Sequence, residues 1–135
     1  MSAASDSVRQ RLYAAIDERQ PELIATIQEL VREPSTLGNE AGVQKVVARH
    51  LAEAGMEVSS YDLPEDTISR PNAGNSGVPF AGRPNVHGHR KGTGGGRSLI
   101  LNGHIDVVSA EPVSAWSHDP YAAEIVGNRM YGRGA

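Results

Sequence analysis

A histidine and an aspartate two residues apart carry the most concentrated chemistry in the sequence. His104 and Asp106 follow an apolar run and a glycine, Gly103. A neutral imidazole is a common metal ligand, and a carboxylate beside it is the usual partner that orients the ring at a catalytic metal. The pair therefore predicts a metal site. A hydrogen-bonded structural histidine at the end of a strand is the alternative.

The residues before the pair predict the element that positions it. Leu99, Ile100 and Leu101 form a continuous apolar run between two glycines. Such a run is typical of a strand that is buried on both faces of a parallel or mixed sheet. Open α/β sheets bind ligands at the carboxyl ends of their strands. A strand here would place His104 and Asp106 where a ligand is expected.

Helices are predicted before this strand. Apolar residues recur at helical spacing over residues 7–33. Pro21 predicts a break or kink near Gln20, because proline fits the first turn of a helix but not its interior. A further helix is predicted to begin after Asn39 as its N-cap and to end at Gly55.

The rest of the chain predicts strands and loops. Strands are predicted at 56–61, 83–90, 98–102, 122–126 and 129–131. Residues 62–82 predict an irregular loop, a glycine-rich connection is expected to join the strands before and after 91–97, and Gly127 with Asn128 predicts a tight hairpin turn. Helices followed by several strands predict an α/β fold, a mixed sheet with flanking helices.

Other patterns suggest a binding role that the residues do not support. The stretch 91–97 lacks the Gly-Lys-Ser/Thr ending of a phosphate loop, and a strand is predicted after it where a phosphate loop needs a helix. His87 and His89 share a strand face and could chelate a metal, but we favour a solvated edge-strand position. His50 and His118 have no partner visible in the sequence.

The composition limits the classes of protein and of site. The 135 residues include no cysteine, so any metal would be held by histidine and carboxylates. The formal net charge of −3 gives no electrostatic case for nucleic acid or anionic lipid as a partner. No stretch approaches the roughly 18 apolar residues of a membrane span, and the polar start lacks the apolar core of a signal peptide. A cytoplasmic protein that contacts no membrane is therefore expected.

Three motifs, in order, resemble the amino-terminal part of an M20-type zinc metallohydrolase. They are residues 102–108 (Asn-Gly-His-Ile-Asp-Val-Val), the cluster of Trp116 with Asp119 and Pro120, and residues 131–135 (Tyr-Gly-Arg-Gly-Ala). Within that family, the sequence resembles the acetylornithine deacetylase and succinyl-diaminopimelate desuccinylase group. The resemblance implies that residues 1–135 are the amino-terminal part of a zinc-peptidase-like catalytic domain, incomplete and without the lid or dimerisation domain.

The resemblance also implies a cofactor and residue roles. In that family, two zinc ions share a bridging aspartate and a bridging water, and a glutamate acts on that water as general base. His104 matches the ligand of one zinc. Asp106 matches the catalytic-site carboxylate that accepts a hydrogen bond from the far ring nitrogen of His104, with a cap or turn role as the alternative. The cofactor would be zinc, with cobalt as a substitute, and the remaining ligands and the base are expected beyond Ala135.

The activity implied is that of a zinc-dependent amidohydrolase that deacylates an N-acyl amino acid such as N-acetylornithine, or hydrolyses a related amide. Desuccinylase, dipeptidase and carboxypeptidase activities are alternatives within this class. The substrate would be a small N-acyl amino acid or a peptide, a homodimer is expected only for a longer parent, and the 135-residue chain alone is expected to be inactive. In another class, the chain would be a stand-alone module that binds a ligand or partner without catalysis.

Two side chains are expected to organise the loops after the pair. Trp116 is predicted to be an anchor that buries its ring and hydrogen-bonds its N–H. Arg133, between two glycines, is interpreted as a residue that organises its own loop, and carboxylate binding is the alternative.

Overall fold

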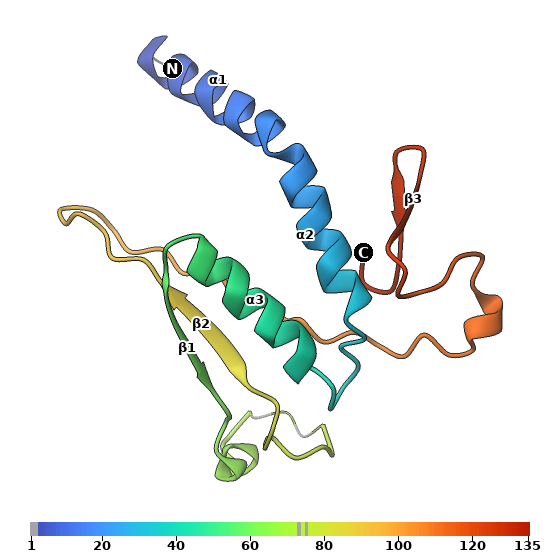
Figure 1. Ribbon diagram of the computed structural model, residues 1–135. Coiled ribbons are helices and arrows are strands. Elements are labelled where there is room, and N and C mark those ends of the chain that lie inside the picture. Colours follow the sequence, from blue (N-terminus) through green and yellow to red (C-terminus); the bar gives the residue numbers. More distant parts are fainter. Residues whose placement is uncertain (1–2, 73, 75) are drawn as a thin grey trace.

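The computed structural model describes residues 3–72, 74 and 76–135 as an α/β chain of helices and small antiparallel sheets (Figure 1). The elements are α1 (Ala3–Glu18), α2 (Gln20–Arg32), α3 (Ala41–Glu53), β1 (Glu57–Tyr61), η1 (Glu65–Ser69), β2 (Asn85–His89), η2 (Val113–Ala115), β3 (Glu124–Val126) and β4 (Arg129–Tyr131). The α/β class expected from the sequence is confirmed. No helix in the described ranges is both long and apolar enough to cross a membrane.

Helices α1 and α2 follow one another as a long rod that bends at their junction (Figure 1). Arg19 separates them, and Pro21 lies in the first turn of α2. This confirms the predicted break, because a proline there removes no intrahelical hydrogen bond that the first turn could have made.

Helix α3 packs on the sheet formed by β1 and β2. Its core residue, Val43, is almost fully buried. At Gly88 of β2 an added Cβ would lie only 3.0–3.2 Å from side-chain atoms of Met56 and Leu51, so a larger residue would require these side chains to move. Gly55, with φ +75°, ends the helix in the left-handed conformation, as predicted.

The predicted N-cap of α3 is wrong by one residue. Glu40 occupies the N-cap position, and it makes no side-chain cap hydrogen bond. The side chain of Asn39 instead donates to the carbonyl oxygen of Pro34 at 2.7 Å, within the turn that joins α2 to α3. Asn39 therefore stabilises the turn and not the helix end.

Two antiparallel strand pairs form, and one of them was predicted. β1 pairs with β2 in antiparallel register from Glu57 with His89 to Tyr61 with Asn85. The β3–β4 hairpin forms around Gly127, whose φ of +64° suits the tight turn, so this prediction is confirmed. The predicted loop at 62–82 also contains the short helix η1, and its residues 73 and 75 lie outside the described residues.

The strand predicted at 98–102 is wrong. Leu99, Ile100 and Leu101 are 81%, 86% and 88% exposed, and no strand is assigned to them. The strand expected to pair with this run, β2, pairs with β1 instead. A continuous apolar run forms a buried strand only where neighbouring strands and covering layers exist, and the described part of the chain supplies neither to these three residues.

Candidate metal-binding site

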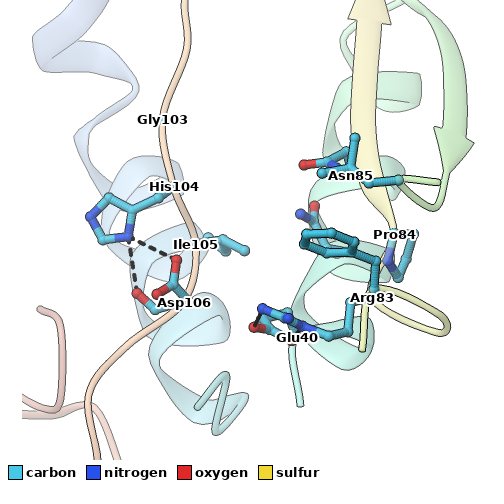
Figure 2. A pocket seen from close by; sticks show the side chains of 11 residues that line it. Glu40, Arg83, Pro84, Asn85, Gly103, His104, Ile105 and Asp106 are labelled. Atoms are coloured by element: carbon cyan, nitrogen blue, oxygen red, sulfur yellow. Dashed lines mark hydrogen bonds and ion pairs between the residues drawn. The ribbon is translucent and has the colours of Figure 1, made fainter. Parts of the chain in front are cut away.

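His104 and Asp106 lie on an extended segment that crosses the end of α2, and their side chains meet (Figure 2). The Nδ1 atom of His104 is 3.0 Å from the backbone oxygen of Asp106 and 3.3 Å from its carboxylate Oδ1. A carbonyl oxygen only accepts, so Nδ1 must carry the proton and donate. In the neutral ring, Nε2 then keeps its lone pair and is free to bind a metal.

The backbone on either side of Asp106 is held by Ser35, in the connection between α2 and α3. The Ser35 hydroxyl donates to the carbonyl oxygen of Ile105 at 2.8 Å. The amide of Val107 donates to the carbonyl oxygen of Ser35 at 2.9 Å, and Thr36 forms a parallel bridge with Val107. Ser35 is 3% exposed, so these bonds are shielded from water. They fix the position of the backbone from which the Asp106 side chain projects.

The role of Ser35 was not foreseen from the sequence. The apolar pattern over residues 7–33 predicts helices and assigns no role to Ser35. The available signal was the Pro34 stop followed by a small polar residue, because a serine hydroxyl readily bonds a backbone group. Its partner is 70 residues away, which no local pattern can identify.

Glu40 and Arg83 face the pair across a cavity of about 180 Å³ (Figure 2). The side chain of Ile105 points towards them, whereas the His104 ring points away. Arg83 donates to both carboxylate oxygens of Glu40, at 2.9 and 2.7 Å, and the backbone amide of Gly38 donates to the same carboxylate at 3.1 Å. This ion pair joins the α2–α3 connection to the start of β2.

The charges of Glu40 and Arg83 interact with each other, and Arg83 also interacts with the charge of Asp106. Burial of the Glu40 carboxyl opposes its ionisation, but the hydrogen bonds from Arg83 and Gly38 outweigh burial, and the pKa of Glu40 lies below its ordinary value. The hydrogen bonds to Glu40 raise the pKa of Arg83, and the negative charge of Asp106 adds to that rise. Arg83 therefore stays cationic and faces the carboxylate beside His104.

His104 and Asp106 also line a larger and more apolar cavity, of about 540 Å³. Ile27, Leu30 and Val31 of α2 line it together with Arg133. Residues 104–106 thus form a wall shared by two cavities. The site has room beside His104 for further ligands and for a small molecule.

Trp116 makes the predicted N–H hydrogen bond in the loop after the pair, but the residue is only half-buried. Its Nε1 donates to the carbonyl oxygen of Ala110 at 2.8 Å, and the Arg133 guanidinium lies 4.6 Å from its ring centroid. The backbone amide of Arg133 donates to Pro120 at 2.7 Å. The contact with Trp116 agrees with a role of Arg133 in organising its loop, because a cation over an indole face is attracted by the ring quadrupole.

The remaining histidines do not join the pair. His50 lies 2.9 Å from Glu29, on the α2–α3 face, and His118 lies 2.9 Å from Glu124. His87 and His89 stack on each other on β2. Within residues 3–72, 74 and 76–135, no three histidine, aspartate or glutamate side chains come together as a metal-binding group. The described residues thus supply His104 as one oriented ligand.

Residues 100–135, which carry the pair and both later motifs, match Peptidase family M20/M25/M40. This part of the chain is therefore similar to the M20 family. This confirms the resemblance that the three motifs predicted, and the matched range begins within the exposed apolar run.

Individual proteins are similar to this chain over a longer range than the family match. The chain is 36% identical over 115 residues to succinyl-diaminopimelate desuccinylase of Rhodopseudomonas palustris, covering 85% of this chain and 26% of that protein. It is 30% identical over 129 residues to N-formyl-4-amino-5-aminomethyl-2-methylpyrimidine deformylase of Bacillus subtilis, covering 92% and 26%. The deformylase of Halalkalibacterium halodurans is 32% identical over 133 residues, covering 95% and 27%. The chain therefore spans about a quarter of the length of these relatives.

Proposed function

We propose that this chain supplies part of the active site of a metal-dependent amidohydrolase that removes an acyl group from nitrogen. One observation carries the proposal: His104 lies inside the family-matched range with its Nδ1 donating to Asp106 and its Nε2 free. That is the arrangement in which an imidazole binds a metal, with a carboxylate fixing its tautomer.

The cofactor that we propose is zinc, with cobalt as a substitute. Zinc in such a site would polarise the scissile carbonyl and lower the pKa of a bound water. His104 would hold the metal through Nε2, and Asp106 would keep the ring oriented and basic. Catalytic zinc sites have about three protein ligands. Because the described residues offer one, we derive no step through the metal and expect the 135-residue chain alone to be inactive.

The substrate class follows from what the relatives have in common. The names of a desuccinylase and a deformylase both denote loss of an acyl group. We therefore propose a small N-acylated substrate, with an N-acyl amino acid such as N-acetylornithine as the first choice and dipeptidase or carboxypeptidase activity as alternatives. We also propose a cytoplasmic location, and a homodimer for a longer protein that contains this chain.

An assay on the protein that carries this segment tests the proposal. Amine release from N-acetyl, N-succinyl and N-formyl substrates is measured with zinc present, for the parent, His104→Ala and His87→Ala. His104→Ala should lose about 10–100-fold or more in activity, since even the loss of a residue that only supports a metal ligand costs this much. His87, exposed on β2, is the matched control and should change nothing. Full activity in His104→Ala would overturn the proposal.

A further inference from the structure

Asn102 and Gly103 form the only Asn-Gly pair in the sequence, directly before His104. Both residues are exposed. Within the described ranges, no backbone–backbone hydrogen bond involves residues 98–103. A Cβ added at Gly103 would find nothing within 4 Å. The peptide unit between these residues is therefore free to rotate and open to water.

We propose that Asn102 is a site of spontaneous covalent modification through a succinimide. The backbone nitrogen of Gly103 gives up its proton and attacks Cγ of Asn102. A new Cγ–N bond forms, the bond from Cγ to Nδ2 breaks, and ammonia leaves with the proton. Water then opens the ring at either carbonyl, which leaves aspartate or isoaspartate at position 102. The balance is one water consumed and one ammonia released, with no change of oxidation state.

The reaction needs two conditions that this pair meets. The attacking amide must not be held in a hydrogen bond, and the backbone must rotate until the nitrogen faces the side-chain carbonyl. Glycine after asparagine helps both, because it has no Cβ to obstruct the approach and the widest backbone freedom. A segment with exposed and unpaired backbone groups opens at little free-energy cost.

Every other asparagine in the sequence is followed by a residue other than glycine. Asn85 lies in β2, opposite Tyr61 in the antiparallel register, and Val86 follows it. The side-chain amide of Asn39 is tied to Pro34 at 2.7 Å, and Glu40 follows it. Both are followed by a side chain that crowds the attacking nitrogen. The modification is therefore expected to be selective for Asn102.

The products would change the candidate site without touching its ligand. Aspartate places a new negative charge two residues before His104. Isoaspartate also routes the backbone through an extra carbon between the apolar run and His104, which would shift any pairing of that run by part of a residue. The effect on a metal site rests on the function proposed above, but the modification itself does not.

Incubation of the 135-residue chain at neutral pH, followed by peptide mass spectrometry, tests the inference. Fragmentation that separates aspartate from isoaspartate is read at every asparagine of the same sample. Asn102 should convert first and give both products, while Asn85 remains unchanged. Equal conversion of Asn102 and Asn85 would overturn the inference.

Gly103→Ala is the matched variant. Gly103 does not have a positive φ and its Cβ position is empty, so alanine fits without strain. Modification of Asn102 should be lost over the period in which the parent chain is half converted, while circular dichroism stays unchanged. Conversion at the parental rate in Gly103→Ala would contradict the proposed attack. Because the readout is mass alone, failure of the enzymatic proposal would not affect it.

Discussion

The two halves of the segment that carries His104 differ in what surrounds them. Residues 98–103 are exposed and make no backbone hydrogen bond to a described residue, whereas residues 105–110 are bonded by Ser35 and Trp116. The upstream half contains the continuous apolar run Leu99–Leu101, and it is the half that the sequence predicts to be a strand. Tertiary partners, and not the apolar pattern, therefore decide which half of the segment is held in place by hydrogen bonds.

The held half owes its position to the connection between α2 and α3. Ser35 bonds it directly, and Glu40 fixes the same connection through Arg83 and Gly38. Substitutions that remove these contacts should therefore lower the stability of the chain. Substitutions in residues 98–101 should have little effect on it.

Glu40→Ala should produce the largest effect. It leaves the half-buried Arg83 guanidinium without its partner, and breaking a buried pair costs about 3–5 kcal/mol. The measurement is the free energy of unfolding from urea denaturation. Glu53→Ala, which removes an exposed partner of Arg49, is the matched control and should change the free energy little. Equal losses in the two variants would contradict the role given to the Glu40 pair.

Ser35→Ala should come next. It leaves the carbonyl oxygen of Ile105 without its donor in a shielded place, at a cost of about 1–3 kcal/mol. Hydrogen exchange of the Val107 amide should also become faster. Ile100→Thr is the control in the unpaired half and should stay within about 0.5 kcal/mol of the parent, since the side chain is exposed. A larger loss of unfolding free energy in Ile100→Thr than in Ser35→Ala would contradict the greater role given to the contacts of residues 105–110.

Acid should weaken the held half through Glu40. The pKa of Glu40 is lower in the folded chain than its ordinary value of 4.5. The unfolded chain therefore takes up the proton first as pH falls. The stability that Glu40 contributes is complete above pH 4.5 and is lost as pH falls through its lowered folded pKa. Unfolding free energies measured from neutral to acid pH should show this fall, and Glu40→Gln should flatten it. An identical acid profile in Glu40→Gln would assign the fall to other carboxylates.

Arg133→Met should have the smallest of these effects. It removes the cation over the Trp116 ring, worth about 0.5–1 kcal/mol at a partly exposed site. Trp116 is the only tryptophan, so its fluorescence reports the change directly. Arg133→Lys should restore part of the signal, because a lysine cation also interacts with an indole. An unchanged spectrum in Arg133→Met would exclude the stacking contact in solution.

Local signals in the sequence predicted much of the fold. The break before Pro21, the end of α3 at Gly55 and the hairpin at Gly127 depend on backbone preferences of single residues, and each is confirmed. The strand at 98–102 failed because its formation depends on partners elsewhere, which the apolar run does not specify.

In the candidate site, too, contacts between residues close in sequence could be predicted, and contacts between distant residues could not. His104 and Asp106 are two residues apart, so their contact could be expected from spacing alone. Ser35 bonds a residue 70 positions away, and Glu40 bonds Arg83 over 43 positions. Contacts at such separations depend on how the helices and the sheet pack, and that packing is not written in any local pattern.

Calorimetric zinc titration of the 135-residue chain tests the central claim most directly, that these residues supply one oriented metal ligand. A single imidazole cannot hold zinc against water with useful affinity, since a site needs about three or four protein ligands. The account predicts weak uptake, no tighter than at an exposed histidine, that is the same in the parent, His104→Ala and His87→Ala. Tight stoichiometric binding that vanishes in His104→Ala alone would contradict it, because another residue would then have to complete a site at His104.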